Sequence, residues 1–330
     1  MLAPVRLRRL PHPGDRAGPM EGAIRRVTVA LSAAVAAAGG VAAVVLVAAP
    51  PSPSAKSSPK GYVIGQFNMA GGTTEHGAKG NPVPDDLAED VADRRPAVLT
   101  LQETCRDWDE RLEDRLKGYG VVFAPVDNLA RNPGSPARCH HPTDFGNTLV
   151  FREDLGFERD TAESHLLGST SGDEYREMVC VRSEERKLVA CSAHLTPGED
   201  EYAASREKEA AEAVRVLAGR YEGYKAVLGG DINDLPLSGV LDRFYHRGYG
   251  HGARGAFKEA AGPCGDAVKP RQPRDSLPRD RYTHCRSGEP THSKGKIDYL
   301  FVSPSVRVEW SGVSHSEQSD HKQVWARVVF

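Results

Sequence analysis

This chain of 330 residues lacks three features that would point directly to a class of protein. It has no excess of basic charge, because 43 Lys and Arg residues face 45 Asp and Glu residues. Proteins that hold nucleic acid mainly by charge are basic, so any polyanion must be bound here through a local site or a metal ion. None of the six cysteines forms a CxxC pair, which argues against a structural zinc site. Aromatic residues make up 7% of the chain and few of them lie in its basic loops, so a platform for stacking nucleobases is not evident.

Charged residues are also absent from positions 27–55, a stretch rich in Ala and Val. Arg25 and Arg26 precede it and small residues lie near its end, which is typical of a secretory signal peptide. Because about 20 apolar residues suffice to span a bilayer, a retained membrane anchor is the alternative. Both interpretations place the rest of the chain outside the cytoplasm, either secreted or anchored to the outer face of the cell membrane. We therefore predict a signal peptide or N-terminal membrane anchor at 1–50, a Pro/Ser-rich linker at 51–60 and one folded domain at 61–330.

All six cysteines lie after the predicted linker, and an even number in an exported domain indicates disulfide bonds. Two predicted strands, 176–182 and 187–195, are joined by the charged turn "SEER", which places Cys180 beside Cys191. The remaining pairs that we expect are Cys264–Cys285, closing a Pro/Arg-rich loop, and Cys105–Cys139.

The folded domain alternates predicted strands with predicted helices. Near-continuous apolar runs and apolar residues repeating every four positions distinguish the two. The strands that we expect are 61–68, 97–103, 146–152, 176–182, 187–195, 224–233, 296–302 and 322–330. The helices that we expect are 84–95, 108–116, 200–219 and a short one at 237–248, with a long loop at 250–295. This order predicts an α/β domain with mixed sheets flanked by helices.

Polar side chains recur where the predicted strands end. One of them, "GGDIN", carries Asp231 and Asn233 two residues apart, so the alternation of a strand directs both side chains to the same side. Alone, such a segment is typical of a turn, because Gly, Asp and Asn favour turns for local reasons. Asn68, Glu103 and His194 end other predicted strands, Asp298 lies inside the strand 296–302, and the run Ser319-Asp320-His321 precedes the last strand. Their number indicates a functional site at one rim of the sheets.

The segments "FNMAG", "LQETC", "SAHLTP", "GGDINDLP", "KIDYLFV" and "SDHKQVWARV" occur in an order that resembles the endonuclease/exonuclease/phosphatase superfamily, also called deoxyribonuclease I-like. The resemblance covers 61–330. It implies a four-layer α/β sandwich of two packed mixed β-sheets flanked by helices, with the site at one rim. It also implies that 61–330 is a catalytic domain that hydrolyses phosphate esters with a divalent cation, Mg²⁺ or else Mn²⁺ or Ca²⁺.

The resemblance also implies a role for each polar residue at the rim. Glu103 would hold the cation, and Asn68 and Asp320 would help to hold or orient it. Asp231 would orient or deprotonate the attacking water, and Asn233 would fix Asp231 or donate to a phosphoryl oxygen.

Three further catalytic residues and one arginine complete this set. His194 and His321 would donate hydrogen bonds to the phosphate or act as acid and base, with Asp298 orienting His321. Arg176 lies in a segment that resembles the family's phosphate-contacting arginine segment, although a structural role at a strand edge is the alternative.

The substrate is less clearly indicated. The family cleaves DNA, RNA, inositol phosphates and sphingomyelin, and no "PAWCDR"-like segment of the inositol-polyphosphate branch is present. The first fifty residues hold six arginines and two acids, which leaves an acidic remainder with 37 basic and 43 acidic residues. Basic side chains nevertheless gather in two of its predicted loops: Arg131, Arg138, His140, His141, Arg271, Arg274, Arg279, Arg281, Arg286, Lys294 and Lys296.

These loops favour a nuclease that acts on DNA or RNA. We also expect the chain to be a monomer. A phosphodiesterase or phosphatase acting on phospholipid or a small phosphate ester is the alternative, followed by a binding protein without catalysis.

Overall fold

The computed structural model describes residues 61–128, 135–169, 174–270 and 282–330. The chain divides into two compact units, 1–56 and 57–330, and the predicted signal peptide or anchor and the linker lie outside the described residues. Within the described ranges, none of the helices has the length and apolar character needed to cross a membrane.

Two six-stranded β-sheets form the centre of the described unit. The first sheet has the strand order β11-β12-β1-β2-β4-β3, and the second has the order β5-β6-β7-β8-β10-β9. The strands of the first sheet are β1 (Tyr62–Asn68), β2 (Val98–Cys105), β3 (Tyr119–Pro125), β4 (Phe145–Arg152), β11 (Arg307–Ser314) and β12 (Gln323–Val329). Those of the second sheet are β5 (Glu163–Ser169), β6 (Tyr175–Ser183), β7 (Leu188–His194), β8 (Lys225–Asp231), β9 (Lys258–Glu259) and β10 (Asp298–Val302). Both sheets are mixed, because β1–β2 and β7–β8 are parallel whereas the other pairs are antiparallel.

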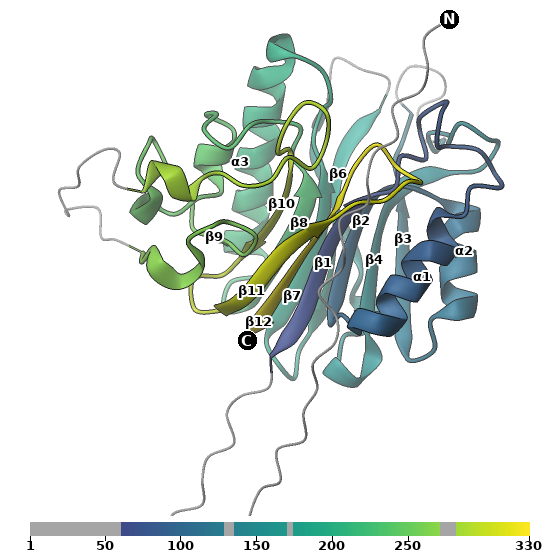
Figure 1. The fold of residues 1–330 in the computed structure, drawn as a ribbon, viewed down its shortest axis with the longest axis horizontal. Coiled ribbons are helices and arrows are strands. Elements are labelled where there is room, and N and C mark those ends of the chain that lie inside the picture. Colours follow the sequence, from purple (N-terminus) through teal and green to yellow (C-terminus); the bar gives the residue numbers. More distant parts are fainter. Residues whose placement is uncertain (1–60, 129–134, 170–173, 271–281) are drawn as a thin grey trace, which may run out of the picture. The chain divides into compact units, whose positions relative to one another are not determined.

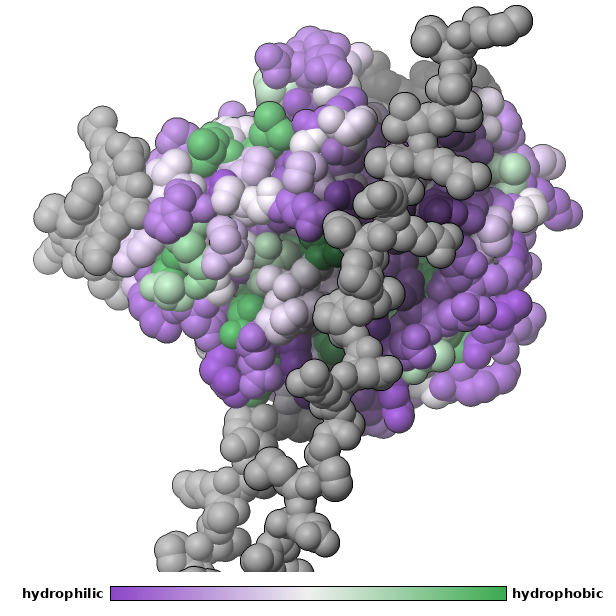
Figure 2. Space-filling model, in the orientation of Figure 1, coloured by the Kyte–Doolittle hydropathy of each residue, from purple (hydrophilic) through white to green (hydrophobic). Residues whose placement is uncertain are grey.

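Helices cover the outer faces of both sheets, as Figure 1 shows. Helices α1 (Val83–Arg94) and α2 (Arg106–Arg115) lie on the first sheet, and α3 (Ala203–Gly219) lies on the second. The surface over α1 and α2 is predominantly hydrophilic (Figure 2). The four-layer α/β sandwich expected from the sequence is therefore confirmed.

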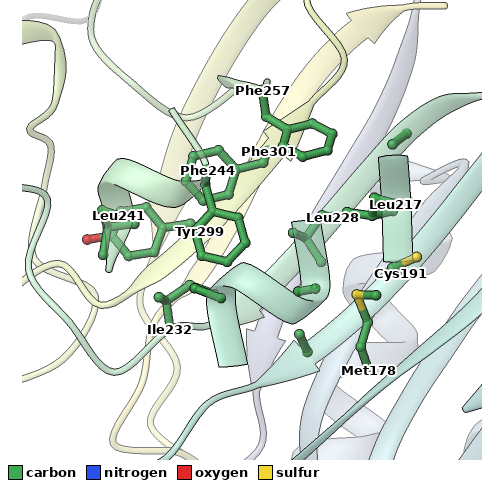
Figure 3. Close-up of a cluster of buried hydrophobic side chains, with 14 of the residues drawn as sticks. Met178, Cys191, Leu217, Leu228, Ile232, Leu241, Phe244, Phe257, Tyr299 and Phe301 are labelled. Atoms are coloured by element: carbon green, nitrogen blue, oxygen red, sulfur yellow. The ribbon is translucent and has the colours of Figure 1, made fainter. Parts of the chain in front are cut away.

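Three hydrophobic clusters hold these layers together. One lies between the sheets and joins Ile64 and Leu149 of the first to Val227 and Leu300 of the second. Another lies beneath α1 and α2, and the third, shown in Figure 3, lies beneath α3. The burial of apolar area in all three interfaces is the main favourable contribution to folding.

Helix α1 could be located from the sequence because its apolar spacing, its acidic first turn and its proline all indicate the same helix. Its buried Leu87 and Val91 are spaced one helical turn apart, and Asp85 and Asp86 in the first turn interact favourably with the positive end of the helix dipole. Pro84 stands at the start of the helix, where its missing N–H is not needed.

The prediction of a helix at 237–248 is wrong. The segment instead holds two short 3₁₀ turns, Leu241–Arg243 and Arg247–Tyr249. The buried Arg286 guanidinium donates to the carbonyl oxygens of Pro236 and Ser238, and the Ser238 oxygen also accepts the backbone N–H of Asp242, so the segment is held by contacts to a distant loop as well as by local turns.

Four strands were not anticipated: β3, β5, β9 and β11. Strand β11 lies at the edge of its sheet with side chains that are mostly exposed or half-buried, so it has no apolar run to reveal it. Strand β9 is only two residues long and lies inside the segment that we expected to be a loop.

All three predicted disulfide pairs are present: Cys105–Cys139, Cys180–Cys191 and Cys264–Cys285. Cys180 and Cys191 are directly opposite each other on β6 and β7, as the predicted hairpin required. The described residues contain no free cysteine.

Candidate active site

Three of the predicted catalytic residues form one row across neighbouring strands of the second sheet. Asp231 at the end of β8 is paired in register with His194 of β7 on one side and Asp298 of β10 on the other. Residues directly opposite one another project from the same face of a sheet. All three side chains are at least 95% buried, and they project toward the first sheet, whose β1 supplies partners to both carboxylates.

Asn68, at the end of β1, connects this row to the first sheet. Its Nδ2 donates to Asp231 Oδ2 at 3.0 Å and to Glu103 Oε1 at 3.1 Å. Its Oδ1 accepts a hydrogen bond from the backbone N–H of Ala70 at 2.9 Å, which fixes the orientation of the amide. A single side chain therefore holds the predicted metal ligand and the predicted base in fixed relation.

Glu103 owes its position to an irregularity in β2. The register between β2 and β4 shifts between Leu101 and Thr104, and Glu103 has a φ of 49°. A bulge re-aims a side chain, and a left-handed backbone at a residue other than Gly is a strained conformation that is concentrated at functional sites. The backbone N–H of Gly72 donates to Glu103 Oε2 at 3.3 Å, so both carboxylate oxygens are oriented.

Asp231 is a buried carboxylate with two imidazoles beside it. Its Oδ2 lies 3.7 Å from Nε2 of His194 and 3.7 Å from Nε2 of His321. Burial, and after it the charge of Asp298, raises the pKa of Asp231 to about 7, although His321 and Asn68 act in the opposite direction. A carboxyl group with a pKa near neutrality is a stronger base than an ordinary aspartate.

His321 and Asp298 form a tight pair behind Asp231. His321 Nδ1 lies 2.9 Å from Asp298 Oδ2, and Asp298 Oδ1 accepts a hydrogen bond from Gln66 Nε2 at 2.7 Å. Burial alone would lower the pKa of His321, but the carboxylates of Asp298 and Asp231 outweigh it and raise this pKa to about 10. This contact fixes the orientation of the His321 ring, with its Nδ1 toward Asp298 and its Nε2 toward Asp231.

His194 has the opposite electrostatic character. Burial, followed by the charges of Arg176 and His321, lowers the pKa of His194 well below its usual value. The two imidazoles beside Asp231 thus differ, with His194 held neutral and His321 held protonated at neutral pH. Sites that push the pKa values of similar groups apart provide both an acid and a base.

Arg176 of β6 lies close enough to this site to influence His194. Its side chain is 9% exposed and lies 3.3 Å from Glu174, measured between Arg176 Nη2 and Glu174 Oε2. Within the described residues its buried Nε has no hydrogen-bond partner. An arginine with an unused buried N–H beside a phosphate-type site is suited to bind an anionic oxygen.

Asn233 is placed differently from the expectation. Strand β8 ends at Asp231, and Asn233 follows it with a φ of 54°, so the strand alternation does not extend to Asn233. Its backbone N–H donates to Asp231 Oδ1 at 2.9 Å, and its side-chain Nδ2 donates to the carbonyl oxygen of Leu195 at 3.1 Å. Asn233 therefore fixes Asp231 through its backbone, while its amide ties the loop after β8 to the loop after β7.

Asp320 lies at the solvent side of the site, with its side chain 40% exposed. Its Oδ2 lies 3.5 Å from His292 Nε2, and its Oδ1 lies 4.0 Å from His321 Nε2. Ligand atoms of His292, Asp320 and His321 gather within 4.8 Å of one another, as do those of Asp231, Asp298 and His321. Glu103 belongs to neither group of described residues.

The side chains at this rim fit a hard divalent cation. Among the described residues, the four carboxylates of Glu103, Asp231, Asp298 and Asp320 lie near the charges of His321 and Arg176, and Arg176 is also paired with Glu174. Oxygen ligands of this kind are the ones that Mg²⁺, Mn²⁺ and Ca²⁺ prefer, and a cation would balance the excess negative charge.

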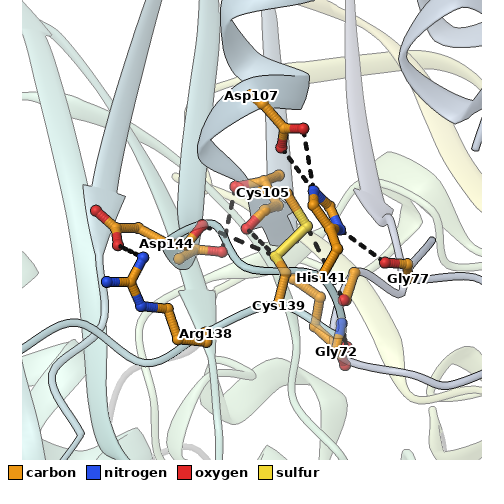
Figure 4. The surroundings of a disulfide bond; sticks show 12 residues. Gly72, Gly77, Cys105, Asp107, Arg138, Cys139, His141 and Asp144 are labelled. Atoms are coloured by element: carbon orange, nitrogen blue, oxygen red, sulfur yellow. Dashed lines mark hydrogen bonds and ion pairs between the residues drawn. A yellow bond between two sulfur atoms is a disulfide. The ribbon is translucent and has the colours of Figure 1, made fainter. Parts of the chain in front are cut away.

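The disulfide Cys105–Cys139 lies next to Glu103, and Figure 4 shows its surroundings. The backbone N–H of Gly71 donates to the carbonyl oxygen of Glu103, and that of His140 donates to the carbonyl oxygen of Gly71. His141 then joins Asp107 to the carbonyl oxygen of Gly77. The disulfide thus anchors the loop that supports the bulge at Glu103.

Two residues that contribute to this rim were not anticipated. Gln66 lies two positions before Asn68 on β1 and therefore points to the same face, which is a signal that the sequence does contain. His292 lies in a loop and has no such signal; its ring packs on that of His321 with a centroid distance of 4.7 Å.

Three solved structures with comparable folds illustrate the likeness. The human Nocturnin catalytic domain with bound sulfate has a TM-score of 0.58 at 16% identity, covering 82% of this chain and 93% of that chain. Humanized TDP2 from D. rerio has a TM-score of 0.56 at 14% sequence identity, covering 81% of this chain and 98% of that chain. A mannosyl-6-phosphatase of Bacteroides thetaiotaomicron has a TM-score of 0.54 at 15% sequence identity, covering 82% of this chain and 100% of that chain. At these identities the likeness shows the fold alone.

A search of curated proteins finds no match. The model of the Endonuclease/Exonuclease/phosphatase family, in contrast, matches residues 65–321, from β1 to the His321 that completes the site. This range contains every residue of the predicted catalytic and metal-binding set. The chain therefore belongs to the Endonuclease/Exonuclease/phosphatase family of phosphoester hydrolases.

Proposed function

We propose that this chain is an exported phosphodiesterase that cleaves DNA or RNA with the help of a divalent cation. One observation carries the proposal: the buried Asp231 carboxylate lies 3.7 Å from two imidazoles, of which one is neutral and the other is protonated. This arrangement provides a base and an acid for hydrolysis at one place.

In the proposed reaction, water attacks phosphorus while the bond from phosphorus to the leaving oxygen breaks. Asp231 orients the water and takes its proton, because the raised pKa makes this carboxylate an effective base. His321, held protonated by Asp298, donates its Nε2 proton toward the phosphoryl group or the leaving oxygen. Arg176 and His194 stabilise the negative charge that grows on the phosphoryl oxygens.

Glu103 and Asp320 are the residues that would hold the cation, with Asn68 orienting Glu103. When bound, a divalent cation polarises the phosphoryl oxygens and neutralises their charge. Magnesium is the ion that we expect, with Mn²⁺ or Ca²⁺ as alternatives.

The assignment to nucleic acid draws on Arg176 and on the exposed Arg138, which precedes Cys139 of the disulfide next to Glu103 and is paired with Asp144. A related fold, D. rerio TDP2, has been solved with a single-stranded DNA product. Two members of the predicted basic loop do not contribute, however. Arg286 and Lys296 are almost fully buried and are paired with Asp242 and Glu259. Arg131, Arg271, Arg274, Arg279 and Arg281 lie outside the described residues.

One observation favours the alternative of a lipid or an apolar small ester. Leu235 and Leu237, just after the Asp231 motif, are 51% and 45% exposed. With Pro236 they line a cavity of about 370 Å³. An apolar cavity beside a phosphate site is suited to the organic part of an apolar substrate.

The test uses the purified full chain with Mg²⁺, Mn²⁺ or Ca²⁺, and with EDTA. Plasmid DNA, RNA, sphingomyelin and a generic phosphodiester are followed in parallel. Asp231→Asn is the inactive variant, and Asp86→Asn, which changes an exposed acid on α1, is the matched control. DNA or RNA cleavage that requires both metal and Asp231 supports the proposal. Cleavage of sphingomyelin or the small ester alone transfers the same chemistry to the alternative substrate, and cleavage that survives Asp231→Asn contradicts the mechanism.

A further inference from the structure

His292 adds a third imidazole to the rim of the site. Its ring packs on that of His321 with a centroid distance of 4.7 Å and an interplanar angle of 34°. Its side chain is 13% exposed, and its Nε2 lies 3.5 Å from Asp320 Oδ2. The mechanism derived above does not use this residue.

The turn that carries His292 is firmly held against the catalytic strands. His292 and Gly295 form a β-bridge with reciprocal backbone hydrogen bonds. Thr291 Oγ1 accepts hydrogen bonds from the backbone N–H groups of Ile297 and Asp298, both at 3.1 Å. The backbone N–H of Lys322 donates to the carbonyl oxygen of Thr291 at 2.7 Å. The turn is therefore tied both to the start of β10 and to the residue after His321, so His292 keeps a fixed place in the site.

A backbone hydrogen bond also fixes the tautomer of the His292 ring. His292 Nδ1 accepts a hydrogen bond from the backbone N–H of Lys294 at 3.1 Å. Since Nδ1 offers its lone pair, the neutral ring must carry its hydrogen on Nε2. The nitrogen that faces Asp320 is thus an N–H donor, with no lone pair to offer a metal ion.

This tautomer decides between two roles for the group formed by His292, Asp320 and His321. Their ligand atoms lie close enough together to hold a metal ion. A histidine that ligates a metal through Nε2 normally donates from Nδ1, whereas His292 accepts there. The geometry therefore favours an anionic ligand for His292 over a cation.

Asp320 does not form a short hydrogen bond with the Nε2–H group of His292. Their separation of 3.5 Å is long for a charge-assisted hydrogen bond, which is usually 2.7–2.9 Å. Asp320 is also 40% exposed, so its carboxylate is free to turn toward a cation. The donor on His292 is consequently available to a ligand at the rim.

We propose that His292 is a substrate-binding residue whose Nε2–H donates to an unesterified phosphoryl oxygen of the substrate. This inference rests on the proposed phosphoester hydrolysis. Arg176 and His194 come from the second sheet near β6 and β7, whereas His292 comes from the turn before β10. The phosphoryl group would therefore be held from two sides.

The first experiment compares His292→Ala with His292→Gln in the full chain, because a glutamine amide can place an N–H near the position of Nε2. We expect KM for a phosphodiester to rise about 10- to 100-fold in His292→Ala, as for the loss of a hydrogen bond to a charged group. His292→Gln should remain within about fivefold of the wild type. His315→Ala, which removes an exposed histidine from the loop after β11, is the matched control and should change nothing. An unchanged KM in His292→Ala overturns the proposal.

The second experiment separates an anion-binding role from a metal-binding one. The affinity for Mn²⁺ without substrate, measured by electron paramagnetic resonance, should stay within about twofold of the wild type in both His292 variants. A tenfold loss of Mn²⁺ affinity in either variant would make His292 a metal ligand and overturn the proposal.

A third measurement separates this inference from the proposed function. Binding of inorganic phosphate, followed by isothermal titration calorimetry, should weaken in His292→Ala and be preserved in His292→Gln. If the wild type hydrolyses no ester but phosphate binding shows this pattern, the proposed function fails and the role of His292 stands. If hydrolysis proceeds but phosphate binding is equal in all variants, the proposed function stands and the role of His292 fails.

Discussion

Two regions of this molecule bury several charged side chains, and they balance the charges differently. In the first, which we call the paired cluster, each acid has its own cation: Asp234 with Arg206, Asp242 with Arg286 and Glu259 with Lys296. In the second, the catalytic cluster of Asp231, Asp298, His194 and His321, the two carboxylates share one protonated imidazole.

The difference explains why only one cluster is reactive. Arg286 has hydrogen bonds to Asp242 and to three backbone carbonyl groups, so its charge is fully satisfied and it holds loops in place. Asp231 instead receives hydrogen bonds only from amides, of Asn68 and Asn233, within the described chain. Its charged form is left poorly compensated, which raises its pKa and makes it able to take a proton.

The largest effect that we expect comes from neutralising the catalytic cluster. Asp231→Asn removes the base, so kcat should fall by roughly 10³-fold or more. The same change should stabilise the fold slightly or leave it unchanged at pH 8, because the buried carboxylate is costly to ionise. Steady-state kinetics and thermal unfolding of one preparation test both parts. A stable protein that keeps its activity would contradict the assignment of Asp231.

Breaking the paired cluster should have the reverse effect. Arg286→Met leaves Asp242 with Arg254, 3.6 Å away, as its remaining cation among the described residues, so we expect a loss of up to roughly 3–5 kcal/mol in the free energy of unfolding. Urea denaturation measures this loss, and the double variant Arg286→Met/Asp242→Asn should recover part of it. Equal stability in wild type and Arg286→Met would show that the two clusters are not distinguished by charge balance.

The third prediction concerns the support of Glu103. Replacing both cysteines of the Cys105–Cys139 pair by alanine removes a 34-residue cross-link and should cost about 2–4 kcal/mol of stability. Activity should fall more than it does in the Cys264→Ala/Cys285→Ala variant, because only Cys105–Cys139 anchors the loop bonded to Glu103. Hydrolysis rates at a temperature where both variants are fully folded decide the point, and equal rates would remove the proposed support.

The last prediction, whose effect is smallest near pH 4 and grows with pH, concerns Asp109, a buried carboxylate outside both clusters. Burial raises its pKa to about 8, and its Oδ2 accepts a hydrogen bond from Thr148 at 2.7 Å. Since the folded state favours the protonated form, wild-type stability should fall as pH rises from about 4 toward 8. Asp109→Asn does not titrate, so its stability relative to wild type should increase by up to about 1 kcal/mol per pH unit in this range. Chemical denaturation at pH 5 and pH 8 measures this difference, and a constant difference would contradict the raised pKa.

Much of the site could be predicted because its residues lie in or next to strands whose apolar runs are easy to recognise: His194 and Asp231 end β7 and β8, and Asp298 begins β10. His194, Asp231 and Asp298 occupy one row for this reason. What the sequence does not reveal depends on long-range packing. The bulge at Glu103 arises only when β2 pairs with β4, 42 residues away between Thr104 and Gly146. The burial of Arg286 likewise depends on Asp242 and on loops that an arginine-rich segment does not identify.

The amide of Asn68 has a consequence for how the whole protein tolerates change. It donates hydrogen bonds to Glu103 in one sheet and to Asp231 in the other. Both bonds can form together only when the two sheets are correctly aligned. A sub-ångström slip between the layers would misalign the site before it unfolded the protein. Substitutions in the inter-sheet core, such as at Val227 or Leu300, should therefore impair catalysis at temperatures where the fold is still intact. The packing of this core therefore sets the geometry of the reaction as well as the stability of the fold.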